Sequence, residues 1–298
     1  MSAPLGYARG GGVILTATGE PVAIYSEMES TVIEGVKHIV AVASGKGGVG
    51  KSTVTANLAL AMAAEGYRVG LLDADIYGPS QARMLGIGEG VRPQQAGENR
   101  FKPLEAHGIQ AMSMAFLVDI NEPMVWRGPM VAGAFQQLLT QTAWDDLDYL
   151  FIDMPPGTGD IQLTLSQKVP VAGAVIVTTP QDIALLDARK GIEMFRKVKV
   201  PVLGVVENMS LHTCSQCGLS EPIFGEGGGE RLTAQYETRL LGQLPLALSI
   251  RQQADGGRPT VVAEPDGEVA ASFRAMARRV AEEIAAQAET GPSISFGD

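Results

Sequence analysis

The sequence predicts a doubly wound α/β fold, in which a mostly parallel sheet is covered by helices on both faces. Short apolar runs alternate with segments of helical periodicity along most of the 298 residues. The apolar runs are nearly continuous, as in strands buried on both faces. A glycine-rich loop links the first run to a helix-like segment, and acidic residues end two others. In such a fold the ligand site lies at the carboxyl ends of the strands.

The predicted strands and helices alternate along the chain. After a first strand at 39–43, strand-like runs recur at 67–72, 109–116, 148–153, 174–179, 202–206 and 240–244. Helical patterns are expected at 53–64, 131–144, 183–198 and 266–287. In the last helix, apolar residues recur at helical spacing: Val269, Phe273, Met276, Val280 and Ile284. Its other face mixes arginine with glutamate, so we expect the helix to pack on the domain and not on a membrane.

Three regions are expected from this pattern. Residues 1–36 form a loose N-terminal arm, in which 15–27 is a candidate for a short strand or an interface contact. Residues 37–290 form one large α/β domain, and residues 291–298 form a short polar tail. The length of the chain is sufficient for a domain of this class.

The composition argues against several classes of partner. Acidic residues outnumber basic ones by 33 to 23, which gives a net charge of −10. An acidic surface disfavours nonspecific binding to nucleic acid or to anionic membranes. No apolar run reaches the roughly 18 residues of a membrane span, and the start of the chain lacks the apolar core of a signal peptide. We therefore expect a cytoplasmic protein with no nucleic-acid partner and no stable membrane association.

A phosphate-binding loop follows the first predicted strand. The segment from Gly45 to Ser52 fits the pattern G-x-x-x-x-G-K-[ST] and lies between a strand and a helix, as the pattern requires. Its glycines let successive backbone N–H groups point at an anion, and the helix N-terminus adds positive charge. The residues expected to bind the nucleotide are Gly47, Gly48, Val49, Gly50, Lys51, Ser52 and Thr53. Lys51 supplies a full charge for the outer phosphates, and the Ser52 hydroxyl is a ligand for Mg²⁺.

A second lysine, Lys46, stands early in this loop, where the general pattern leaves the residue free. Two interpretations remain open. Lys46 is either a solvated loop charge or a group that crosses an interface to a nucleotide bound by a partner subunit, as an arginine finger does. The second interpretation makes Lys46 a catalytic residue beside Lys51.

Acidic residues follow two predicted strands on the ligand side of the sheet. Asp73 and Asp75 close the strand at 67–72. One of them would orient Mg²⁺-bound water, and we expect Asp75 to position the water that attacks the γ-phosphate. The alternative is that both only cap the loop. Asp153 ends the strand at 148–153, at the position where a carboxylate holds Mg²⁺ in P-loop proteins.

Two further residues are candidates for nucleotide contacts. Gly157 lies in the loop at 154–160, which can bind the γ-phosphate through a backbone N–H and relax after hydrolysis. The alternative is an ordinary turn between a strand and a helix. Asn208 follows the strand at 202–206, and its amide can both donate to and accept from the adenine edge. Asparagine at a strand end is also a common turn former.

The two cysteines of the chain, Cys214 and Cys217, form a C-x-x-C pair. Such a pair alone fits a redox dithiol, half of a zinc site or half of an iron–sulfur site. Two thiolates do not complete a four-thiolate shell, but a two-fold symmetric dimer doubles their number. Four thiolates would satisfy a [4Fe–4S] cluster or a zinc ion. His212 is an alternative third ligand, or an ordinary loop histidine.

Seven motifs span most of the chain. They are S-G-K-G-G-V-G-K-S-T from Ser44, L-L-D-A-D-I-Y-G-P-S from Leu71, V-W-R-G-P-M from Val125, F-I-D-M-P-P-G-T-G-D from Phe151, E-N-M-S from Glu207, C-x-x-C at Cys214 and F-G-E-G-G-G-E from Phe224. Together they resemble the Mrp/ApbC family of iron–sulfur cluster carrier ATPases, P-loop NTPases with a deviant loop that are related to the nitrogenase iron protein. The resemblance implies a homodimer that binds ATP, hydrolyses it slowly, holds a labile [4Fe–4S] cluster between its subunits and passes it to apo iron–sulfur proteins.

The chain departs from that family in one respect, and two other classes of protein are alternatives. Many members of that family carry a small domain ahead of the ATPase domain, whereas 36 residues precede it here, so we expect recipients to dock elsewhere. A partitioning or positioning ATPase shares the deviant loop, but it predicts a basic patch or a basic terminal helix and gives the cysteines no task. A nucleotide-dependent scaffold with negligible hydrolysis also fits, because a sequence does not give rates.

Overall fold

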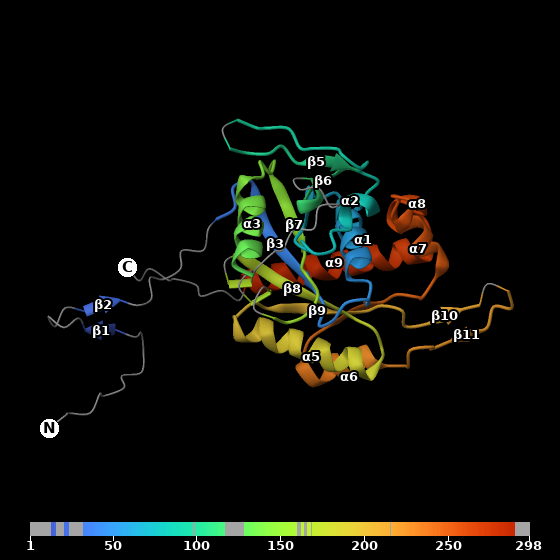
Figure 1. Cartoon of the computed structure of the whole chain (residues 1–298). Coiled ribbons are helices and arrows are strands. Elements are labelled where there is room, and N and C mark those ends of the chain that lie inside the picture. The colour runs from blue at the N-terminus through green and yellow to red at the C-terminus, as the bar shows by residue number, and fades with distance from the viewer. Residues whose placement is uncertain are drawn as a thin grey trace, which may run out of the picture.

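A central eight-stranded sheet organises the chain (Figure 1). The computed structural model describes residues 13–15, 21–23, 32–97, 99–116, 128–159, 162–163, 166–167, 169–214 and 216–289. The strand order is β12-β9-β8-β3-β7-β4-β6-β5, and every neighbouring pair is parallel except β5 with β6. The predicted doubly wound α/β fold is thereby confirmed.

The strands of this sheet are largely buried. They are β3 (Val36–Ala43), β4 (Val69–Asp73), β5 (Leu104–Ala106), β6 (Ile109–Ser113), β7 (Leu147–Asp153), β8 (Val171–Thr178), β9 (Val202–Glu207) and β12 (Leu240–Gln243). In β3, Ile39 and Ala41 belong to one core, whereas Val40 and Val42 belong to the other. Successive side chains point to opposite faces, so a strand covered on both faces must be apolar throughout.

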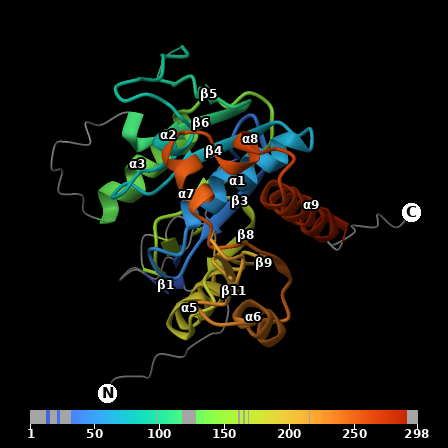
Figure 2. The same cartoon turned by 90° about the vertical axis from the view of Figure 1, so that its right-hand side faces the viewer.

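Helices cover both faces of the sheet. They are α1 (Lys51–Ala64), α2 (Gln81–Met84), α3 (Gly128–Gln141), α5 (Asp182–Lys197), α6 (Gly228–Tyr236), α7 (Leu248–Asp255), α8 (Thr260–Ala263) and α9 (Glu268–Glu289). Helices α3, α5 and α6 contribute to the core on one face, and α1, α8 and α9 to the core on the other. Figure 2 shows α9 well separated from α5 and α6. The predicted apolar stripe of the last helix packs on the domain, as expected.

The structure shortens one predicted strand and contains helices that were not predicted. The predicted strand at 109–116 is too long, because β6 ends at Ser113 and Met114–Phe116 is a 3₁₀ helix. The Ser113 hydroxyl accepts the N–H of Ala115 at 3.2 Å, which favours a turn over a continued strand. Helices α6, α7 and α8 were not predicted, because their nine, eight and four residues give too short a periodic pattern.

Two hairpins extend from this architecture. In the N-terminal region, where the sequence predicts a short strand, β1 (Val13–Leu15) pairs with β2 (Pro21–Ala23). The second hairpin, β10 (His212–Thr213) with β11 (Ser220–Glu221), carries the cysteines. The remainder of the predicted arm up to residue 31, residues 125–127 of the V-W-R-G-P-M motif, Asp160 and the predicted tail at 291–298 lie outside the described residues. No helix in the described ranges is both long and apolar enough to cross a membrane.

Candidate functional site

The carboxyl ends of β3, β4 and β7 lie side by side and carry the charged residues of the site. Strand β7 pairs with β3 on one side and β4 on the other, and the register places Asp73 opposite Asp153. Strand β3 continues through residues 44–50 into α1. The topology thus brings the predicted phosphate loop to both strand-end carboxylates, at the edge where parallel sheets bind ligands.

The phosphate loop has the backbone that its glycines predict. Gly48 and Gly50 have φ angles of 84° and 82°, in the left-handed region. A Cβ on Gly50 would lie 2.3 Å from the side-chain nitrogen of Asn208, so this position has no room for a side chain. Gly50 is also the N-cap of α1 and provides no side-chain cap. The first N–H groups of α1 are therefore left to face an anionic ligand.

Lys51 opens α1 and reaches the end of β7. It is 6% exposed, and its ammonium lies 2.5 Å from Asp153 Oδ1 and 3.2 Å from the Ser52 hydroxyl. The Thr55 hydroxyl donates to the same Asp153 oxygen at 3.1 Å. Because Asp153 is fully buried, water screens this ion pair weakly. The structure thus brings together three of the predicted site residues, Lys51, Ser52 and Asp153.

Gln81, the first residue of α2, belongs to the same cluster, and the sequence analysis missed it. Its Nε2 donates to Asp153 Oδ2 at 2.8 Å and to the Ser52 carbonyl at 3.0 Å. The side chain is 1% exposed. A single glutamine in a loop gives no sequence signal of a site, so only the fold identifies this contact.

Asp73 is the second fully buried carboxylate of the cluster. It accepts backbone N–H groups of Asp75 and of the start of α2 at 3.0–3.1 Å. Burial and, after it, the negative charge of Asp153 raise the pKa of Asp73 to about 7. Burial also raises the pKa of Asp75, whose carboxylate accepts the N–H of Gly78 at 3.2 Å.

The donor set of this cluster fits Mg²⁺. Ser52 offers a hydroxyl, and Asp73 and Asp153 offer carboxylate oxygens, which are the hard ligands that Mg²⁺ prefers. The cluster places two buried carboxylates, Asp73 and Asp153, beside the one ammonium of Lys51. A divalent cation would balance this excess, either in contact with these oxygens or through its own water molecules.

Two of the other predicted nucleotide contacts, Gly157 and Asn208, bond to the loop between β3 and α1. Gly157 has a φ of 103°, and its N–H donates to the Ser44 carbonyl at 3.0 Å. Asn208 is 8% exposed, and its Nδ2 donates to the Val49 carbonyl at 2.9 Å. The ammonium of Lys46 takes part in none of the ion pairs between described residues. The nucleotide roles of Gly157, Asn208 and Lys46 stay predictions.

The cysteines lie on a separate element, the β10–β11 hairpin, which projects from the body of the molecule (Figure 1). Cys214 is half-buried, Cys217 is exposed, and both thiols are free. The N–H groups of Cys217 and Gln216 lower the pKa of the Cys214 thiol, which favours the thiolate, the form that binds metals. Within the described ranges, no group of three or more His, Cys, Asp or Glu side chains could hold a metal ion. The alternative third ligand, His212, has Nδ1 3.0 Å from the Leu246 carbonyl.

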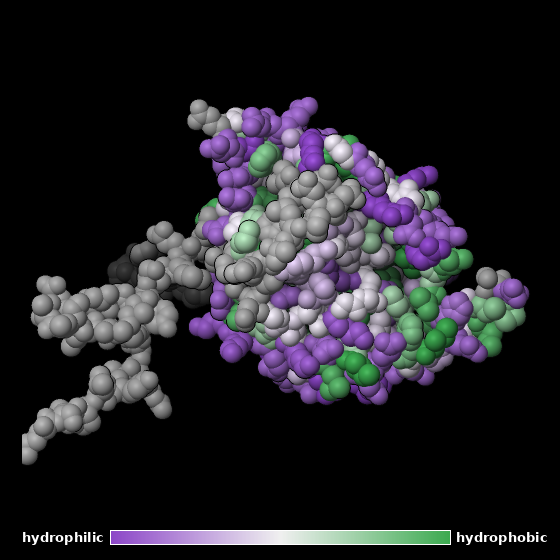
Figure 3. All heavy atoms as spheres, in the orientation of Figure 1, coloured by the Kyte–Doolittle hydropathy of each residue, from purple (hydrophilic) through white to green (hydrophobic). Residues whose placement is uncertain are grey.

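Exposed apolar side chains accompany these thiols. Leu211, Leu219 and Ile223, which we call the hairpin rim, are 41%, 57% and 53% exposed. Figure 3 shows hydrophobic surface on the side of the molecule from which the hairpin projects. Apolar groups gathered in this way commonly mark a contact surface.

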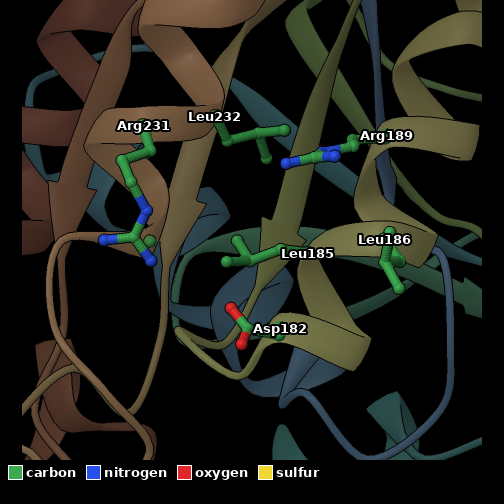
Figure 4. A pocket seen from close by; sticks show the side chains of 7 residues that line it. Asp182, Leu185, Leu186, Arg189, Arg231 and Leu232 are labelled. Carbon is green, nitrogen blue, oxygen red and sulfur yellow. The ribbon is translucent and has the colours of Figure 1, made fainter.

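A cavity of about 230 Å³ lies between α5 and α6. Its lining consists of Asp182, Leu185, Leu186, Arg189, Gly228, Arg231 and Leu232. In Figure 4, Arg189 extends from α5 towards Leu232 of α6. The lining shares no residue with the phosphate loop or the hairpin, so the cavity is separate from both.

The fold and the phosphate loop define a nucleotide-binding P-loop NTPase, in which the loop follows a central strand and Lys51 meets a strand-end carboxylate. Residues 35–281 match a family model described as "ParA: NUBPL iron-transfer P-loop NTPase". The chain therefore belongs to the family of NUBPL iron-transfer P-loop NTPases. This membership confirms the resemblance drawn from the seven motifs.

Relatives and solved structures agree with this placement. The chain is 69% identical over 242 residues to an iron–sulfur cluster carrier protein of Pseudomonas fragi, covering 81% of this chain and 84% of that protein. It is 58% identical over 265 residues to the iron–sulfur cluster carrier protein of Escherichia coli K12, covering 89% and 72%. A nucleotide-binding protein of Archaeoglobus fulgidus in complex with ADP has a TM-score of 0.68 and 38% identity, covering 79% and 91%.

The close approach at Gly50 predicts that Gly50→Ala loses nucleotide binding. Its added Cβ would strike the Asn208 side chain, and φ is positive. Gly66→Ala is the matched control, because Gly66 also has a positive φ, 97°, but open space around it. The control should lose only about 1 kcal/mol of stability from the backbone. Calorimetric titration with ADP and thermal unfolding measure both effects; wild-type ADP affinity in Gly50→Ala would contradict the prediction.

The raised pKa of Asp73 predicts a pH dependence of stability. Between about pH 4 and 7 the folded state binds a proton at Asp73 that the unfolded state has released. The free energy of unfolding therefore falls as the pH rises through this window, by at most about 1.4 kcal/mol per pH unit for one group. Asp73→Asn should make this fall smaller, because the raised pKa of Asp75 contributes a fall of the same sign. Urea unfolding of the nucleotide-free protein across this pH range measures it, with the exposed Asp255→Asn as control; the same pH dependence in wild type and Asp73→Asn would refute it.

Proposed function

We propose that this protein is an ATP-hydrolysing carrier that holds an iron–sulfur cluster as cargo and passes it to apo iron–sulfur proteins. The observation that carries the proposal is the pair of free thiols, Cys214 and Cys217, displayed on an exposed hairpin. Membership in an iron-transfer family and relatives named iron–sulfur cluster carriers support it. A transferable cargo requires ligands that a recipient can reach, and this hairpin offers them.

The proposed cargo site is shared by two copies of the chain. Each copy supplies two thiolates, and the described residues contain no third ligand grouped with them. A two-fold axis beside the hairpin would bring four thiolates together, the number that a [4Fe–4S] cluster needs. The hairpin rim of Leu211, Leu219 and Ile223 would exclude water from this contact. Zinc is the alternative occupant of four thiolates.

The proposed nucleotide site uses the P-loop cluster. Backbone N–H groups from Gly47 to Thr53, through Val49, would bind the phosphates of ATP, and the Lys51 ammonium would exchange Asp153 for the outer phosphates. Ser52 and Asp153 would hold Mg²⁺, which neutralises charge on the phosphates when bound. Asp75 would position the attacking water. Lys46, which forms no ion pair among the described residues, would reach the nucleotide of the partner subunit.

The remaining assignments complete this proposal. The N–H of Gly157, now bonded to the Ser44 carbonyl, would turn to the γ-phosphate when ATP binds and return after hydrolysis. Asn208 would contact the adenine. Residues 37–290 would act as one ATPase domain, with 1–36 and 291–298 as flanking segments. Free thiols are typical of a reducing compartment, in agreement with a cytoplasmic location.

Removing either thiol should abolish cluster binding. Anaerobic reconstitution with iron and sulfide should give wild-type protein about four irons per dimer, whereas Cys214→Ser and Cys217→Ser should retain little. Thr213→Ala is the control, because Thr213 lies on the same hairpin and only bonds Ser220 across it. Iron and sulfide analysis together with light scattering measures cargo and dimer. Equal cluster content in all four proteins would remove the proposal.

Lys51→Ala should reduce ATP turnover by about 100-fold or more. The Lys51 ammonium is the full positive charge that the start of α1 would place at the outer phosphates. Cluster content after reconstitution without nucleotide should stay unchanged, since the cysteines lie on a separate hairpin. Lys37→Ala serves as the control. Lys37 lies at the start of β3, at the end opposite the phosphate loop, and pairs with the partly exposed Asp148. Phosphate release assays measure turnover; wild-type turnover in Lys51→Ala would refute the assignment.

A further inference from the structure

Gln81 holds two elements of the P-loop cluster through one amide nitrogen. Nε2 donates to Asp153 Oδ2 at 2.8 Å and to the Ser52 carbonyl at 3.0 Å. Both partners only accept. The Ser52 group is a backbone carbonyl, and Asp153 is a carboxylate that accepts from Lys51 and Thr55. Reversing the amide would place oxygen against oxygen on both sides. The orientation of the Gln81 side chain is therefore fixed by its surroundings.

This orientation leaves the amide oxygen of Gln81 without a partner. Oε1 is buried and has no hydrogen bond among the described residues. A buried acceptor left without a donor costs about 1–3 kcal/mol. Gln110 provides the contrast within the same chain, since its Nε2 donates to the Asp145 carbonyl at 3.2 Å and its Oε1 accepts the Asp145 N–H at 3.1 Å. Gln253 Oε1 is also buried without a partner among the described residues, but of the two oxygens only that of Gln81 belongs to a side chain bonded to Asp153 and Ser52.

The neighbours of Gln81 do not supply the missing donor. None of the described residues donates to Oε1. The Asp73 oxygens accept backbone N–H groups, Asp153 accepts from Lys51 and Thr55, and the Lys51 ammonium bonds Asp153 and the Ser52 hydroxyl. A nucleotide phosphate does not supply it either, because phosphate oxygens accept. A water molecule bound to Mg²⁺ does, because Mg²⁺ keeps several of its waters and polarises their O–H groups.

We propose that Gln81 is a positioning residue for Mg²⁺: Nε2 fixes Asp153 and the start of α1 at Ser52, while Oε1 accepts a hydrogen bond from a metal-bound water. This inference rests on the proposed function in that it takes the nucleotide site to use Mg²⁺. Outer ligands of this kind orient the inner ones and commonly change metal affinity by 10-fold or more.

Two substitutions separate the acceptor role from the donor role. Gln81→Met keeps the length of the side chain but removes both the donor and the acceptor. Gln81→Glu keeps an acceptor oxygen and removes the donor. Gln110→Met is the matched control at a glutamine whose amide nitrogen and oxygen each have a partner within the protein. Thermal unfolding without ligand reports how much each substitution affects the fold.

The test measures the dissociation constant of ADP by calorimetry, once with Mg²⁺ and once with a chelator. For each variant, the constant with chelator is divided by the constant with Mg²⁺, so a larger ratio means stronger help from Mg²⁺. General damage to the fold affects both constants and cancels in this ratio. We expect the ratio to fall about 10-fold in Gln81→Met and to stay at or above the wild-type value in Gln81→Glu and Gln110→Met.

Two results would overturn the inference while leaving the proposed function intact. A wild-type ratio in Gln81→Met would show that the metal does not use this oxygen. An equal loss in Gln81→Met and Gln81→Glu would show that only the donor bonds to Asp153 and Ser52 matter. A ratio near one in the wild-type protein would overturn the inference together with the proposed Mg²⁺ site, and absence of ADP binding would overturn the nucleotide assignment itself.

Discussion

The buried charges at the ends of β4 and β7 constrain the rest of the structure. Asp73 and Asp153 are fully buried beside a single lysine, Lys51. Burying charge in this way is unfavourable unless each group has partners. The fold provides them through the first turn of α1, the start of α2 and the Ser113 hydroxyl, which donates to Asp73 at 3.4 Å. Elements far apart in the sequence therefore have to meet at one edge of the sheet.

Glycine contacts place the phosphate loop close to the elements that carry the hairpin. A Cβ on Gly45 would lie 2.1 Å from the backbone of Asp187 in α5, so loop and helix touch directly. At the start of the same helix, Pro180 lies 3.0–3.5 Å from the Cβ positions of Gly225 and Gly228, just after the hairpin. A change of the loop on nucleotide binding would therefore meet α5, and through it the base of the hairpin. Helix α5 therefore contacts both the phosphate loop and the segment that follows the hairpin.

The sequence predicted the parts of this structure that depend on repeated patterns. Buried parallel strands, the long helices and the phosphate loop each leave a pattern of several residues, and each is present. The end of β6 was not predictable, because it depends on Ser113 bonding Ala115 and Asp73. Gln81 was not predictable either, since its role follows from two hydrogen bonds to residues 29 and 72 positions away. The C-x-x-C motif gave the ligand type, but the projecting hairpin came only from the structure.

Because the chain carries a net negative charge, the stability of the proposed dimer depends on the cluster and the nucleotide that it binds. Two copies of a chain with a net charge of −10 repel each other. The hairpin rim is small, so apolar burial alone gives limited attraction against that repulsion. A cluster bound by four thiolates adds bonds across the contact, and Lys46 reaching an anionic nucleotide would add another. In the proposed carrier, ATP and cargo thus stabilise the assembly that holds the cargo, so loss of the γ-phosphate would weaken the same contact that a recipient has to open.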